Sequence, residues 1–282
     1  MAPPPWRKLL WVKQPYPDNY VDASFLSQLK RNLHVQQYSF WTLASDSAVI
    51  IAHMATVALF ISVFIEIYAR GSEPLGVAAG GSGLTLAGFL TIDSCKGIPA
   101  NSKTQTFKSA FIIVSTLLGL SPVLKSLTQS TASDSIWAVS FWLLLANVYF
   151  HDYSSRRNRL FPPTLSTNLA LSAAIVLASR LPTTMGVFSF LLFSIELFGL
   201  FPVFLHWLHG YSYEGHLALT AALVGLTEYA TVHITGRWGG ALWALVVVTV
   251  AFVGPGWLIV MQRYKNEIQG PWDPAKPVLR TR

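Results

Sequence analysis

The chain has 282 residues, of which 52% are hydrophobic and only 12% are charged. An ordinary soluble chain carries about 25% charged residues, so this chain has too little polar surface to cover itself in water. The composition therefore excludes an ordinary soluble globular protein and predicts an integral membrane protein.

The first 44 residues are predicted to form a cytosolic segment that precedes the membrane. Within Val21–Trp41, Phe25, Leu29, Leu33 and Phe40 fall on one helical face, which is typical of an amphipathic helix. Such a helix either lies on the cytosolic membrane interface or docks on a partner subunit, and both can hold. No apolar stretch follows the first basic residues closely enough for a cleaved signal peptide, so we expect the first span to target the chain to the membrane.

Eight windows are apolar and long enough to cross a hydrocarbon core of about 30 Å. They predict an all-α fold, a polytopic transmembrane helix bundle over residues 45–262, followed by a cytosolic tail over residues 263–282. The second window is rich in small residues, and the fifth is short and carries Asn168, but small residues suit close packing between helices. The predicted spans are Ser47–Ile65, Leu75–Ile92, Phe107–Leu124, Ile136–Phe150, Leu165–Ser179, Met185–Trp207, Leu217–Ile234 and Gly239–Met261.

Positive charges predict the orientation of these spans, because cytosolic loops collect Lys and Arg. If the amino terminus is cytosolic, both termini and loops two, four and six face the cytosol, and that side holds sixteen of the 20 Lys and Arg residues. Only Arg70, Lys125, Arg180 and Arg237 fall on the other side. The net charge of +7 thus indicates topology, with attraction to anionic lipid as a second interpretation. No motif for nucleic-acid binding accompanies it.

Motifs that would indicate independent chemistry are missing from the sequence. Cys95 is the only cysteine, so no internal disulfide forms, and no Asn-x-Ser/Thr glycosylation site is present. We find no glycine-rich phosphate loop, zinc-protease motif or nucleophile elbow, and we expect no cofactor. Glycosyltransferases that use a nucleotide sugar need a sizeable soluble domain, which this chain lacks.

Ionisable residues inside the predicted spans each cost a few kcal/mol unless they are partnered. Glu196 lies deepest and Glu228 follows, with His53 and Asp46 in the first span. In a transporter the two glutamates would be proton or substrate sites. Otherwise they bond across helices or to a partner subunit, which is the interpretation we favour.

Two further groups of polar residues lie near predicted helix ends. Lys125, Asp134 and Arg180 fall on one side of the membrane, where we expect an interfacial ion-pair cluster. Three histidines surround another short loop, but they lack further ligands and a shared helical face, so no metal site is predicted. These histidines are His206, His209 and His216.

Four stretches of the sequence resemble the PIG-C family. They are KQPYPDNYVDASFLSQLKRN, SPVLKSLTQSTASDSI, LSTNLALSAAIVLASRLP and YKNEIQGPWD, and they run from about residue 13 to residue 273. The pieces PDNYVD, SPVLK, ASRLP and GPWD are specific in combination. The family is a multispanning subunit of the phosphatidylinositol N-acetylglucosaminyltransferase complex of the endoplasmic reticulum.

The resemblance implies a function that composition does not. The complex moves N-acetylglucosamine from its UDP carrier to phosphatidylinositol on the cytosolic face, which is the first step of glycosylphosphatidylinositol anchor synthesis. Transfer is attributed to the PIG-A subunit, and PIG-H, PIG-P, PIG-Q and PIG-Y are the other expected partners. We therefore expect a non-catalytic scaffold that also forms part of the lipid acceptor site, with no catalytic residue carried over. The alternatives are a transporter or lipid flippase that uses Glu196 and Glu228, and a membrane enzyme active alone.

Three lysines are the candidate residues for binding the anionic acceptor lipid or the catalytic partner. Lys96, Lys103 and Lys108 belong to a predicted cytosolic loop, on the side where the sugar donor resides. Lys108 is the first choice, because it begins the predicted Phe107 helix near headgroup level, where an ammonium can reach a phosphate. The alternative is that these lysines only orient the chain.

Overall fold

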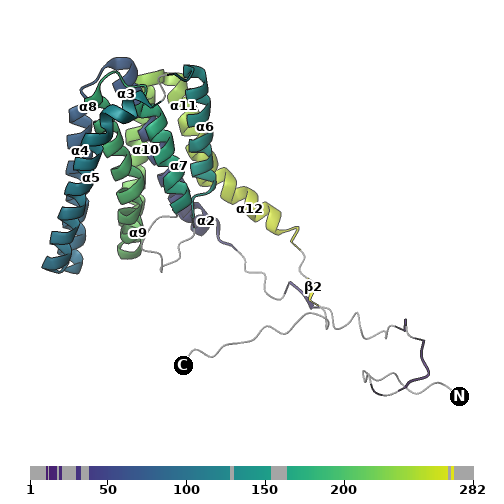
Figure 1. The fold of residues 1–282 in the computed structure, drawn as a ribbon. Coiled ribbons are helices and arrows are strands. Elements are labelled where there is room, and N and C mark those ends of the chain that lie inside the picture. The colour runs from purple at the N-terminus through teal and green to yellow at the C-terminus, as the bar shows by residue number, and fades with distance from the viewer. Residues whose placement is uncertain are drawn as a thin grey trace. The chain divides into compact units, whose positions relative to one another are not determined.

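The computed structural model describes residues 11, 13–17, 19–20, 30–32, 38–127, 130–153, 164–265 and 268–269. Nearly all regular structure in these residues is helical (Figure 1), which confirms the all-α prediction. The chain divides into two units, residues 41–255 and residues 1–40 with 256–282. The second of these contains strand β1 (Lys30–Arg31), which pairs antiparallel with β2 (Ile268–Gln269).

Each of the eight predicted windows falls, to within a residue, on a helical segment. The helices are α2 (Phe40–Asp46), α3 (Ala48–Arg70), α4 (Pro74–Lys96), α5 (Ala100–Ser126), α6 (Ser133–Tyr149), α7 (Thr164–Ala178), α8 (Thr184–Ile195), the π-helical η1 (Glu196–Leu200), α9 (Phe201–Tyr211), α10 (Tyr213–Thr235), α11 (Arg237–Val248), the π-helical η2 (Thr249–Val253) and α12 (Gly254–Gln262). Segments α8, η1 and α9 follow one another without a break, as do α11, η2 and α12.

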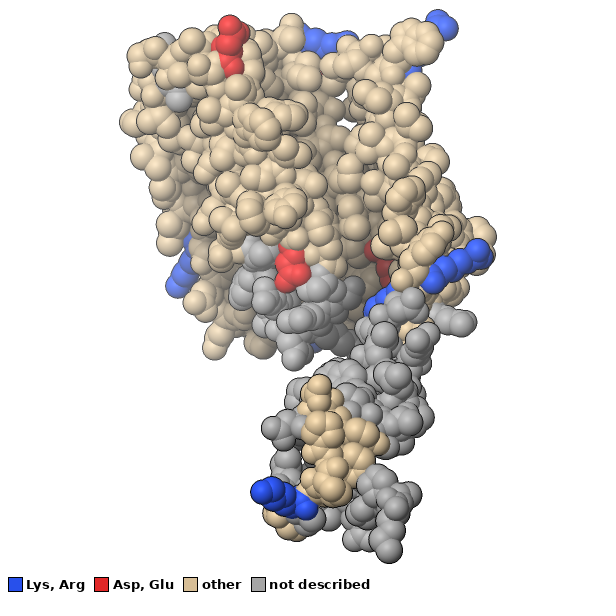
Figure 2. Space-filling model, turned by 90° about the vertical axis from the view of Figure 1, so that its right-hand side faces the viewer, with Lys and Arg blue, Asp and Glu red and all other residues tan. Residues whose placement is uncertain are grey.

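Six helices among the described residues are long and apolar enough to cross a membrane. Helices α6 and α7 are shorter, with 17 and 15 residues. The count of eight spans therefore stays a prediction. On the face shown in Figure 2, the charged side chains of the bundle gather at its two ends and leave an uncharged band between them.

The amphipathic helix predicted for Val21–Trp41 is not continuous in the described residues. Lys30 and Arg31 form the strand β1, and Asn32 has a φ of 56°, in the left-handed region. Among the described residues, the first helix begins at Phe40. The rest of the predicted helix lies outside the described residues. Lys30 and Arg31 pair with Ile268–Gln269, a partner that the local pattern does not reveal, and the remainder of the helix stays a prediction.

Two glycines end the first long helices. Gly71 follows α3 with a φ of 67°, and its N–H donates to the Glu66 carbonyl. Gly97 follows α4 with a φ of 65°, and its N–H donates to the Asp93 carbonyl. Only glycine adopts this left-handed conformation without a steric cost, so both positions stop the helix cleanly.

The core of the bundle forms around α8, which packs against α4, α5 and α7. Phe60 of α3 stacks on Phe190 of α8 with ring centroids 4.9 Å apart, and Phe198 of η1 meets Phe60 edge-on at 5.2 Å. Helix α7 contributes a face of small buried residues, which lets its backbone approach its neighbours closely. These residues are Ala170, Ala173, Ala174 and Ala178.

Other helices keep most of their apolar surface outside. In α4, α5 and the α11–α12 segment, only 6% of the apolar window is buried. Leu84 of α4 and Trp238 of α11 are 77% and 83% exposed. Such surfaces need lipid or other protein chains to cover them.

Candidate functional site

The three candidate lysines flank a connection that is shorter than predicted. Lys96 is the last residue of α4, whereas Lys103 and Lys108 lie within α5. Helix α5 begins at Ala100 rather than near Phe107, because the polar residues before the apolar window continue the same helix. Only residues 97–99 separate the two helices, so Lys96 and Lys103 lie near helix ends and Lys108 lies in the third turn of α5, instead of in a loop.

Asp93 organises this connection. One of its carboxylate oxygens lies 2.7 Å from Lys103 Nζ, and the other accepts a hydrogen bond from the Ile98 N–H at 3.0 Å. The charge of Lys103 is therefore compensated within the chain. Lys96 and Lys108 are exposed at the same end of the bundle.

Lys125 and Arg180 lie at the C-terminal ends of α5 and α7, at the end of α5 opposite to Lys103, and each hydrogen-bonds to a neighbouring connection. Lys125 Nζ donates to the Pro182 carbonyl at 2.7 Å, and Arg180 Nη2 donates to the Thr131 carbonyl at 2.6 Å. Asp134 lies in the first turn of α6. Both of these bonds are to backbone carbonyls, and they tie together the connections that precede α6 and follow α7.

Glu196 is a buried carboxyl group, 8% exposed, at the junction of α8 and η1. Ser82 Oγ of α4 donates to Glu196 Oε1 at 2.6 Å. Glu196 Oε2 is buried and has no protein partner among the described residues. Single π-helical turns within α-helices occur frequently at functional sites.

Glu228 lies on a different helix and meets a different neighbour. A Cβ added at Gly240 of α11 would lie 2.7 Å from Glu228 Oε1, so the glutamate of α10 packs against a glycine. Glu196 packs in the same way against Gly81 of α4. The two glutamates thus face different helices.

The three histidines separate into a pair and a single residue. The rings of His209 and His216 meet edge-on with centroids 4.9 Å apart, and His216 is buried. His206 is exposed. Among the described residues, no three His, Cys, Asp or Glu side chains come together as a metal site would require.

A polar network that the sequence did not predict joins α3, α6 and α7. His53 Nε2 lies 3.1 Å from Asn147 Oδ1, and Asn147 Nδ2 donates to the carbonyl and the hydroxyl of Ser166, each at 2.8 Å. All three residues are buried. An asparagine in the predicted span Ile136–Phe150 needs such a partner, and this requirement could have identified Asn147.

His151 and Tyr153 extend this network beyond the end of α6. The His151 ring stacks on the His53 ring with centroids 3.8 Å apart, and His151 Nδ1 lies 3.2 Å from Ser166 Oγ. The Tyr153 hydroxyl donates to the Val148 carbonyl at 2.7 Å. Burial lowers the pKa of His151 and raises the pKa of Tyr153 to about 12, so both side chains are uncharged near neutral pH.

The chain matches a known family over most of its length. The family model described as GPI2, phosphatidylinositol N-acetylglucosaminyltransferase, matches residues 6–273. No solved structure matches the chain.

Curated relatives cover nearly the whole chain. A protein of Schizosaccharomyces pombe named phosphatidylinositol N-acetylglucosaminyltransferase GPI2 subunit is 41% identical over 98% of this chain and 87% of its own length. The Saccharomyces cerevisiae protein of the same name is 33% identical over 99% of this chain and 100% of its own length. A Homo sapiens protein, also named as a subunit of phosphatidylinositol N-acetylglucosaminyltransferase, is 33% identical over 96% of this chain and 92% of its own length.

Proposed function

Because the chain belongs to the GPI2 family of phosphatidylinositol N-acetylglucosaminyltransferase subunits, we propose that it is the non-catalytic membrane scaffold of this transferase. The transferase carries out the first step of glycosylphosphatidylinositol anchor synthesis. The relatives of this chain are named as transferase subunits. These names fit the scaffold function and not the alternative of a transporter or flippase.

The fold supports a scaffold without a sugar-nucleotide site of its own. Between residues 38 and 265, the described residues form membrane-type helices and short connections. Nothing in that part of the chain has the size of a soluble domain for UDP-N-acetylglucosamine. We therefore assign sugar transfer to a partner, the PIG-A subunit.

The exposed helices supply surfaces for the other subunits. Helices α4, α5 and the α11–α12 segment bury little of their apolar surface within the chain. In the membrane these faces can pack against spans of PIG-H, PIG-P, PIG-Q and PIG-Y as well as against lipid. The endoplasmic reticulum membrane, with both termini in the cytosol, is the location that this assembly requires.

A membrane scaffold contributes to catalysis by placing the acceptor. The headgroup of phosphatidylinositol lies at the interface, and a soluble catalytic domain must meet it there in the correct orientation. Holding both on one scaffold reduces the entropic cost of their encounter. Lys96 and Lys108, exposed at the end that is predicted to be cytosolic, suit contact with an anionic headgroup or with the catalytic subunit.

Purification separates this function from independent catalysis. The chain alone, reconstituted with phosphatidylinositol and UDP-N-acetylglucosamine, is expected to form no product, while the complex purified through the same tag forms it. Cells that lack the chain should lose the product. Product formation by the chain free of partners would contradict the proposal, as would failure to co-purify the catalytic subunit.

A further inference from the structure

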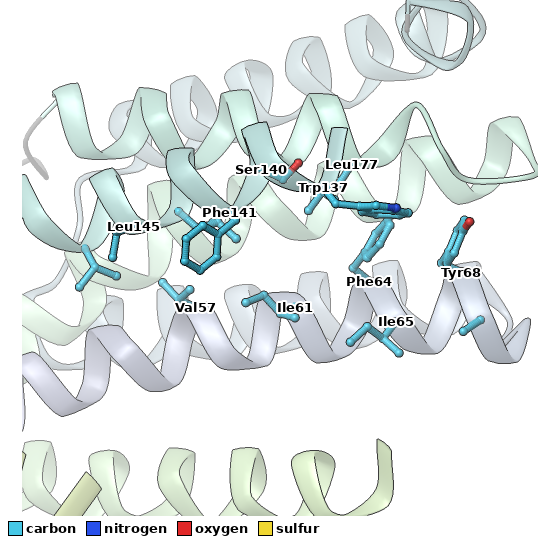
Figure 3. Close-up of a pocket in the computed structure, with 13 residues that line it drawn as sticks. Val57, Ile61, Phe64, Ile65, Tyr68, Trp137, Ser140, Phe141, Leu145 and Leu177 are labelled. Carbon is cyan, nitrogen blue, oxygen red and sulfur yellow. The ribbon is translucent and has the colours of Figure 1, made fainter. Parts of the chain in front are cut away.

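An apolar groove of about 500 Å³ runs along the side of the bundle between α3 and α6 (Figure 3). Aliphatic and aromatic side chains from both helices line it almost completely. Several of them, including Ile61 and Leu145, are exposed along the groove. The main lining residues are Val57, Ile61 and Phe64 of α3 and Trp137, Phe141 and Leu145 of α6.

The two ends of the groove differ in chemistry. At one end Phe64, Tyr68 and Trp137 form an aromatic cluster with centroid distances of 5.4 to 5.8 Å. The other end reaches Val57 and Val148, which lie next to the His53 and Asn147 region in their helices. The groove therefore has an aromatic end and an end beside the polar network of His53, Asn147, His151, Tyr153 and Ser166.

The dimensions of the groove favour an extended chain over a helix. From Val57 to Ala69 the axis of α3 rises about 18 Å at 1.5 Å per residue. A volume of about 500 Å³ over this length gives a mean cross-section of roughly 28 Å². An α-helix about 10 Å across needs on the order of 80 Å². A hydrocarbon chain can therefore lie within the groove along its length, whereas a spanning helix of a partner subunit would lie over the groove and insert only its side chains.

We propose that this groove holds one acyl chain of a diacyl phospholipid, with the lipid headgroup at the His151 and Tyr153 end. The groove opens toward the side of the bundle, where a lipid can enter it from the bilayer. Its length of about 18 Å is close to the depth of one leaflet in a hydrocarbon core of about 30 Å. The predicted topology places the polar end in the cytosolic leaflet, because α3 begins and α6 ends there.

The headgroup end offers neutral polar groups to a lipid. His151 and Tyr153 are only partly buried; the imidazole can bond to phosphate, and the Tyr153 hydroxyl, which already donates to the Val148 carbonyl, can accept a hydrogen bond from a lipid hydroxyl group. Phosphatidylinositol and structural phospholipids share the phosphodiester. The choice between them rests on the proposed function, whereas the acyl-chain site rests on the groove alone.

Photolabelling of the purified complex in lipid nanodiscs tests this site. The probe is phosphatidylinositol with a diazirine in one acyl chain, and phosphatidylcholine with the same chain is its counterpart. We expect labelled peptides from residues 57–69 of α3 and residues 137–148 of α6. Co-purification of the catalytic subunit is measured on the same samples, so that a failure of assembly is distinguished from an empty groove.

Two variants fill the groove from opposite walls. Ile61→Trp and Leu145→Phe should each reduce labelling of α3 and α6 several-fold. Leu242→Trp is the matched control, because Leu242 is an exposed apolar residue of α11 outside the groove. It should leave the labelling unchanged. If the larger Trp variant fails to assemble, the Leu145→Phe variant decides.

Competition with unlabelled lipid identifies which phospholipid supplies the acyl chain in the groove. Preferential competition by phosphatidylinositol supports the groove as part of the acceptor site, and equal competition by phosphatidylcholine supports a structural phospholipid. The proposal is overturned if wild-type α3 and α6 are not labelled, or if labelling persists in assembled groove variants. A photoreactive residue at Ile61 that crosslinks to a protein subunit instead of lipid would overturn it as well.

Discussion

The carboxylate of Glu196 occupies the space that a side chain at Gly81 would need. A Cβ at position 81 would lie 2.5 Å from Glu196 Oε2 and 3.2 Å from Phe193 Cδ2. The next residue, Ser82, donates its hydroxyl hydrogen to the other oxygen of the same carboxylate. Helix α4 thus meets η1 at a residue without a side chain, and the carboxylate of η1 fills the gap.

Substitution of Gly81 by Ala should destabilise the chain. The new methyl group displaces the Glu196 carboxylate and weakens its bond to Ser82, at a cost of about 1–2 kcal/mol. Gly80→Ala is the control, because a Cβ at Gly80 meets nothing within 4 Å. Thermal unfolding in detergent measures both, and equal stabilities of the two variants would show that α4 does not depend on this fit.

Replacement of Asn147 by Ala should be more damaging than replacement of Asn168. Asn147 is 1% exposed and hydrogen-bonds to both His53 and Ser166, so its loss removes the bond to the buried His53 imidazole, at a cost of about 1–3 kcal/mol. Asn168 of α7 is exposed. Unfolding temperatures of the two variants provide the comparison. A loss for Asn168→Ala as large as that for Asn147→Ala would count against the network.

Acidification should destabilise the folded chain through His151. Burial lowers its pKa in the folded state, so the unfolded state, with an ordinary pKa near 6.5, binds the proton more readily. The stability contribution is complete above about pH 6.5 and is lost as the pH falls toward the lowered value. His53, Asp152 and Tyr153 surround the ring; Asp152 opposes the shift.

The comparison of wild type with His151→Gln isolates this titration. Unfolding temperatures are measured between about pH 7.5 and 5.5, around the ordinary histidine pKa. The glutamine variant should lose less stability across that interval than the wild type. Parallel pH profiles would assign the acid sensitivity to other groups.

Replacement of Lys108 by Gln should weaken the use of phosphatidylinositol while the complex still assembles. One basic residue near an anionic surface contributes about 1 kcal/mol, which corresponds to a several-fold rise in the apparent KM. Lys125→Gln, at the opposite end of α5, should leave that KM unchanged in the assembled complex. Lys103→Gln should disturb the turn at Asp93 more than lipid binding. Unchanged kinetics for Lys108→Gln would leave these lysines with an orienting role alone.

The predicted topology can be tested with the chain's single cysteine. Cys95 is exposed near the end of α4 that should face the cytosol. A membrane-impermeant maleimide should label it in sealed microsomes. In a Cys95→Ser background, Glu73→Cys at the other end of α4 should react only after the membrane is permeabilised. The reverse pattern would invert the orientation.

Hydropathy located the helices because a long apolar window without charges is stable only as a helix that crosses the membrane or packs inside the bundle. It misplaced helix ends, since the hydrogen bonds of α5 continue through polar residues to Ala100, well before Phe107. The predicted helix around Lys30 depended on local periodicity, which contains no information about a strand partner at Ile268–Gln269.

Tertiary partners were harder to predict than the residues that need them. Glu196 stood out as a deep carboxyl group, but nothing near it in the sequence indicates Ser82, which lies 114 positions away. Asn147 and Ser166 are 19 positions apart in the sequence and meet because α6 and α7 pack side by side. Pairing of this kind depends on how the helices are arranged, which a single sequence does not fix.

The π-helical turn η1 divides one span into two halves with different surroundings. On its N-terminal side, every residue of α8 from Gly186 to Ser194 is buried. On its C-terminal side, α9 has no fully buried residue. A π-helical turn holds one residue more than the α-helical turn that it replaces, so deleting one residue within η1 should let the span continue as a regular α-helix and leave His209 facing His216. The same deletion within α8 would rotate the rest of the span by about 100°, so η1 is the position at which we expect this span to tolerate the loss of one residue.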